Sequence, residues 1–152
     1  MSERSQKAVE LFLSGYNCCQ AVVGAFVDVI NIDFNTAVKI ASGFGGGVGR
    51  MREICGAVSG MVFVLSNVDG YSEPGDTEKK KELYAKIQKL SAIFKEREGS
   101  IVCRELLPKK ITDDKSSVPS PRTAEYYHSR GCVGCVECAS QILDDYLSGK
   151  LQ

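Results

Sequence analysis

Cysteine is the residue type in this 152-residue chain whose number and spacing most clearly suggest chemistry. A thiol-rich chain in a reducing compartment is more often a metal-binding or redox protein than one held by structural disulfides. Because the number of cysteines is odd, they cannot all pair within one chain. The seven are Cys18, Cys19, Cys55, Cys103, Cys132, Cys135 and Cys138.

A glycine-rich stretch, "GFGGGVGRMREICGAVSG" (43–60), leads to Cys55. No register of it completes a dinucleotide fingerprint or a Walker loop, so no nucleotide cofactor is expected. Glycines also permit positive φ and close approach of another segment. We therefore expect this loop to seat Cys55 at a helix start, where Arg50 and Arg52 stabilise its thiolate. The loop glycines are Gly45, Gly46, Gly47 and Gly49.

The C-terminal cysteines form a CxxCxxC pattern. On a helix, Cys132 and Cys135 are neighbours, whereas Cys138 points away from Cys132. The pattern resembles the start of a bacterial ferredoxin run without its CxxxCP, and a CxxC at a helix start also suits dithiol exchange. Neither CxxC is followed by histidine, so no covalent haem is expected. His128 is interpreted as an ordinary surface or core residue.

These cysteines must be positioned by helices, because apolar residues recur with helical spacing along most of the chain. Cys18, Cys55, Cys103 and Cys132 lie at or near predicted helix starts or turns, so their thiols could converge. Residues 61–65 are also compatible with a strand, and 109–122 predict a mobile loop. The predicted helices are 5–14, 18 to about 30 after Asn17, one capped by Asn35, 53 to about 67, 77–98 capped by Asp76, 123–129 and 134–148.

The fold expected from this pattern is all-α. It is a single compact domain over residues 1–152 with six or seven helices and a glycine-rich loop before a buried central helix. The formal net charge is zero, which gives no field to attract nucleic acid. The N-terminus lacks the features of a secretion signal, and the longest uncharged stretch, 54–68, is short for a membrane span. We therefore expect a cytoplasmic protein without membrane insertion.

Four segments together resemble the C_GCAxxG_C_C family of redox-active proteins: "GYNCCQAV" (15–22), "GGGVGRMREICGAVSG" (45–60), "CRELL" (103–107) and "CVGCVECASQILDDYL" (132–147). The resemblance implies that the family cysteines are Cys18, Cys55, Cys103 and Cys132. It also implies that the remaining three cysteines, Cys19, Cys135 and Cys138, are additions in this chain.

Three functions are compatible with these residues. The first is a thiol-dependent oxidoreductase or electron-transfer protein. In it, Cys55 exchanges disulfides with a redox partner protein, and a second family cysteine resolves the mixed disulfide. In the second, Cys18, Cys55, Cys103 and Cys132 bind an iron–sulfur cluster in an electron carrier or sensor. In the third, the same four bind structural zinc in a helical partner-binding module. The apolar helices are also compatible with a homodimer.

Overall fold

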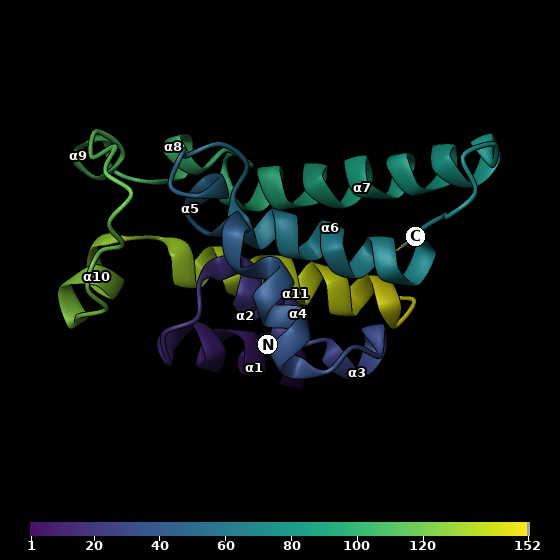
Figure 1. The fold of residues 1–152 in the computed structure, drawn as a ribbon, viewed down its shortest axis with the longest axis horizontal. Coiled ribbons are helices and arrows are strands. Elements are labelled where there is room, and N and C mark those ends of the chain that lie inside the picture. Colours follow the sequence, from purple (N-terminus) through teal and green to yellow (C-terminus); the bar gives the residue numbers. More distant parts are fainter. Residues whose placement is uncertain (152) are drawn as a thin grey trace.

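Helices form most of the protein, and the structure, a computed structural model, describes residues 1–151 (Figure 1). Within these residues no strand forms, and the only bridge outside the helices joins Ile54 to Val102. The predicted all-α fold is confirmed. The elements are α1 (Glu3–Leu13), α2 (Cys18–Gly24), α3 (Val27–Ile30), α4 (Phe34–Ala41), the 3-10 turn η1 (Ser42–Phe44), α5 (Gly45–Val48), α6 (Gly56–Asp69), α7 (Thr77–Glu98), α8 (Cys103–Leu106), α9 (Lys109–Thr112), α10 (Ala124–Ser129) and α11 (Cys132–Leu147).

Side-chain caps define several helix ends, as the sequence indicates. Asn17 and Gln20 form a capping box at the start of α2, so two of its free N–H groups are satisfied locally. Asp76 accepts a hydrogen bond from the N–H of Lys79 at the start of α7. The predicted cap of α4 is wrong, because Asp33 accepts the N–H of Thr36 and Asn35 lies inside the helix.

Two predicted helices have different bounds. The helix expected from 18 to about 30 is two helices, because the backbone leaves the helical conformation at Phe26, whose side chain is completely buried. The central helix begins at Gly56 instead of residue 53. Its three expected first residues are extended, because Glu53 and Cys55 make backbone hydrogen bonds with the segment before α8.

The hydrophobic core lies between α11, α6, α2 and α1, with α7 along one side (Figure 1). Helix α6 is buried along most of one face, and its residues 61–65 are helical, so the strand alternative is wrong. Close contact between α6 and α2 depends on small residues. A Cβ at Gly60 would lie 2.9 Å from Cβ of Val22.

The segments that carry cysteines gather at one end of these packed helices. Figure 1 shows α5 and α8 beside the beginning of α6, with α10 and the beginning of α11 below them at the left. Among the described residues, no helix is long and apolar enough to cross a membrane.

Candidate functional site

The glycine loop is a left-handed turn. Five successive residues, Gly46 to Arg50, have φ values between 57° and 68°. This conformation costs a residue with a Cβ about 1–2 kcal/mol, so glycine at three of the five positions limits the strain. The turn closes on itself through hydrogen bonds from Gly49 N–H to Gly43 O (2.9 Å) and from Glu53 N–H to Gly47 O (2.9 Å).

Two glycines let other cysteines approach this turn. A Cβ at Gly47 would lie 2.6 Å from Cβ of Cys103, and a Cβ at Gly56 would collide with Sγ of Cys18. The loop also turns the N–H of Gly46 toward the sulfur of Cys18. The glycines therefore position Cys18 and Cys103, besides preceding Cys55.

A short pair of extended segments holds Cys55 and Cys103 together. The N–H of Cys55 donates to Ile101 O (2.8 Å), and the N–H of Cys103 donates to Glu53 O (2.6 Å). Both cysteines stand at helix starts, since Cys55 is the N-cap of α6 and Cys103 begins α8. This pairing connects residues almost 50 positions apart.

The remaining thiols of the site come from α2 and α11. Cys18 begins α2, and Cys132 begins α11 with Cys135 one turn later. Because α11 packs against both α2 and α6, this turn faces the other cysteines. Cys135 lines the same cavity as Cys55 and is the neighbour that most raises the pKa of the Cys55 thiol.

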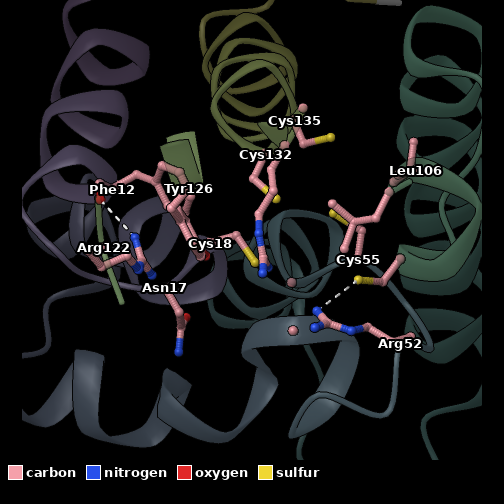
Figure 2. Close-up of a pocket in the computed structure, with 16 residues that line it drawn as sticks. Phe12, Asn17, Cys18, Arg52, Cys55, Leu106, Arg122, Tyr126, Cys132 and Cys135 are labelled. Carbon is pink, nitrogen blue, oxygen red and sulfur yellow. Dashed lines mark hydrogen bonds between the residues drawn. The ribbon is translucent and has the colours of Figure 1, made fainter. Parts of the chain in front are cut away.

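Five thiols line one cavity of about 50 Å³, here called the thiol pocket (Figure 2). They are Cys18, Cys55, Cys103, Cys132 and Cys135. Cys19 is buried in the core beside them, and Cys138 lies on another part of α11 near Arg97 and Glu98. The four cysteines that resemble those of the family therefore share a pocket, and Cys135 joins them.

Burial raises the pKa of four pocket thiols, those of Cys18, Cys55, Cys103 and Cys132. It raises the pKa of Cys18 and Cys132 to about 12 each, with a smaller contribution from neighbouring thiols. Cys135 raises the pKa of Cys55 most, followed by burial, whereas the N–H groups of Ala57 and Val58 lower it. The prediction that Cys55 has a lowered pKa is wrong, because burial and a thiol neighbour outweigh the helix start.

The two arginines of the loop point to different places. Arg50 donates to the carbonyls of Ser116 and Val118 and pairs with Asp114 at 3.4 Å, away from Cys55. It thereby holds part of the segment that the sequence predicts to be mobile. Arg52 is only 5% exposed, and its Nη1 lies 4.0 Å from Sγ of Cys103. Its charge lowers the pKa of Cys103, although burial raises it more.

Three further residues of the thiol pocket were not expected from the sequence. The ring of Tyr126 lies near two guanidinium groups, with Cζ of Arg122 at 4.7 Å and Cζ of Arg130 at 4.2 Å from its centroid. Arg122 also donates to the carbonyls of Phe12 (3.2 Å) and Tyr16 (3.1 Å). Arg122 precedes the N-cap of α10 and Arg130 is its C-cap, so helical spacing in the sequence does not identify them.

A metal ion in a protein is held by side chains that converge on one point. Within residues 1–151, no three His, Cys, Asp or Glu side chains are arranged so that they could hold one metal ion. An iron–sulfur cluster or structural zinc needs about four converging ligands. Thiol exchange needs only two thiols whose sulfurs can meet.

Comparison with known proteins identifies one family. No curated protein and no solved structure matches the sequence. The model of the C_GCAxxG_C_C family, described as "putative redox-active protein", matches residues 16–146. This match includes all seven cysteines and every residue that lines the thiol pocket except Phe12. The chain therefore belongs to the C_GCAxxG_C_C family.

Proposed function

We propose that this protein is a thiol–disulfide redox protein in which Cys55 and Cys135 form the reacting pair. The observation that supports it most is that both thiols line one small pocket with three other thiols, where Cys135 is the neighbour that most raises the pKa of Cys55. A reversible disulfide needs two sulfurs that can meet without unfolding. Cys55 and Cys135 come from different helices, α6 and α11, that pack against each other.

The exchange takes place in two steps. The Cys55 thiolate attacks a sulfur of an oxidised disulfide, the S–S bond of that disulfide breaks, and its other sulfur leaves as a thiolate. Cys135, after losing its proton, attacks the sulfur of Cys55 and releases the second thiolate. The two protons from Cys55 and Cys135 neutralise the two leaving thiolates. Two thiols of the protein become a disulfide, and the substrate gains two electrons and two protons.

The protein residues around Cys55 assist the first step. The N–H groups of Ala57 and Val58, at the start of α6, favour negative charge on its sulfur. Because burial helps to keep the pKa of Cys55, Cys18 and Cys132 high, few of these thiols are ionised at neutral pH without a substrate. Cys18, Cys103 and Cys132 line the same pocket and are positioned to receive the disulfide from the first pair.

The proposal is tested by oxidising reduced protein under nitrogen with a small neutral disulfide. We expect the loss of two thiols and a Cys55–Cys135 disulfide in peptide mass spectra. In Cys135→Ser, Cys55 should accumulate as a mixed disulfide with the reagent. Cys138→Ser is the matched control, because Cys138 lies on the same helix but outside the thiol pocket.

Two results would overturn the proposal. The first is the absence of any disulfide within the oxidised protein while its circular dichroism remains native. The second is stoichiometric iron with visible absorbance, or stoichiometric zinc, in protein purified without oxygen. A disulfide between other pocket cysteines, with Cys55 and Cys135 still free, would refute the assignment of the pair.

A further inference from the structure

Arg52 is a buried cation with an unused hydrogen-bonding edge. Arg52 is 5% exposed, and its Nη1 faces Sγ of Cys103. Within residues 1–151, its Nε and Nη2 have no hydrogen-bond partner. Figure 2 shows its side chain entering the thiol pocket below Cys18 and Cys55. A buried charge without a partner destabilises the folded protein. An unpaired guanidinium edge at this place therefore indicates a ligand.

The two unpaired nitrogens define the kind of ligand. Nε and Nη2 are on the same side of the guanidinium, so their N–H bonds point in parallel. This edge makes paired hydrogen bonds with two oxygens of one carboxylate or one phosphate-like group. A single water or thiolate cannot satisfy both N–H bonds with the same geometry. The unused edge therefore favours a group with two adjacent anionic oxygens.

The surroundings of Arg52 carry further positive charge. Arg122 and Arg130 also line the thiol pocket, and no Asp or Glu lines it in the described part of the chain. In that same part, Arg52, Arg122 and Arg130 form no salt bridge within 4.0 Å. Three arginines therefore share this space without a carboxylate from the protein.

A larger cavity of about 260 Å³, here called the vestibule, shares its wall with the thiol pocket. Arg52, Arg122, Tyr126 and Arg130 line both spaces, and Arg50 lines the vestibule. Arg122 donates to the carbonyl of Phe12 and Arg130 to Oγ of Ser120, and both guanidinium groups lie beside the ring of Tyr126. The vestibule is therefore a preorganised, positively charged space of a size suited to a small molecule.

We propose that the vestibule binds a small anionic molecule through a carboxylate or a tetrahedral oxyanion group, which Nε and Nη2 of Arg52 hold beside the thiols. Arg122 and Arg130 contribute further positive charge. That this molecule is a substrate of the thiols rests on the proposed redox function. The binding of this molecule does not rest on the redox function, because binding depends on the arginines alone.

Binding is tested on the reduced protein by calorimetric titration at constant ionic strength. Inorganic phosphate and sulfate represent the tetrahedral oxyanions, acetate and malonate represent the carboxylates, and chloride is the reference anion. We expect one of the two classes to bind with a stoichiometry of one. Arg52→Lys retains the charge but loses the paired edge, so it should bind at least tenfold more weakly, as should Arg52→Met.

Arg97→Met is the matched control, because it removes the same charge from the exposed surface of α7. It should bind the anion as the wild type does. The proposal is refuted if neither class binds more tightly than chloride, or if Arg52→Lys and Arg97→Met bind the anion equally well. A native circular dichroism spectrum for each variant shows that the loss is not due to unfolding.

A second measurement separates this inference from the redox function. Reduced protein is oxidised separately with three small disulfides, which carry carboxylates, hydroxyls or ammonium groups. The rate for each disulfide is divided by the rate at which the same disulfide reacts with a small thiol in solution. We expect the carboxylate disulfide to have the highest ratio, with at least a tenfold loss of this preference in Arg52→Met but not in Arg97→Met. Equal ratios for all three disulfides would refute anionic substrate binding and leave the redox proposal standing. Failure of all three to form an internal disulfide would refute the redox proposal, and the titration would still decide the anion site.

Discussion

Replacing Gly47 by alanine tests whether the left-handed loop positions Cys103. The φ of Gly47 is 68°, and a Cβ there would lie 2.6 Å from Cβ of Cys103 and 2.6 Å from the backbone N of Glu53. Neither neighbour is the flexible end of a side chain. The substitution must therefore displace the backbone of the loop or the start of α8.

The expected loss of unfolding free energy in Gly47→Ala has two parts. Left-handed backbone at alanine costs about 1–2 kcal/mol, and overpacking costs about 1–3 kcal/mol, which together give about 2–5 kcal/mol. Gly49→Ala is the matched control, because its φ is 57° but a Cβ there would have nothing within 4 Å. It should cost only about 1–2 kcal/mol. Gly43→Ala has neither problem and should leave stability unchanged or raise it by about 1 kcal/mol at most.

The assay is urea unfolding of reduced protein followed by circular dichroism. With a slope of about 2 kcal/mol per molar urea, the midpoint should fall by about 1–2.5 M for Gly47→Ala and by about 0.5–1 M for Gly49→Ala. The difference between the two variants isolates the contact with Cys103 and Glu53. Equal midpoints for both variants, with equal slopes, would refute the argument that Gly47 is needed for close packing.

Two further predictions concern the start of α2 and the thiols. Because burial raises the pKa of Cys18 and Cys132 to about 12, their alkylation by iodoacetamide should accelerate about tenfold per pH unit from 7 to 10. A plateau below pH 8 in native protein would contradict this, and the urea-unfolded chain should level off near pH 9. Asn17→Ala removes the side chain that accepts the N–H of Gln20 at 2.9 Å, so it should destabilise the protein by about 1 kcal/mol in urea unfolding. Asn17→Ser can accept the same N–H and should recover most of this loss, and equal stability of both variants would contradict a capping role.

Local signals in the sequence were enough for the all-α fold and for several helix ends. Asp76 and Gly99 bound α7 as predicted, because a cap and a left-handed terminal residue act within a few positions. The placement of Cys18, Cys103 and Cys132 at helix starts could also be predicted from such signals. The predicted cap Asn35 failed because Asp33, two residues earlier, makes the same kind of hydrogen bond.

Only the tertiary structure decided which thiols and charges meet. The placement of Cys55 and Cys135 in one pocket depends on the packing of α6 against α11, and no local signal contains it. The left-handed turn sends Arg50 toward residues 114–118 and Arg52 into the thiol pocket, although the two are neighbours in the sequence. The high thiol pKa values have the same origin, because the sequence indicates the helix starts that favour a thiolate but not the burial that opposes it.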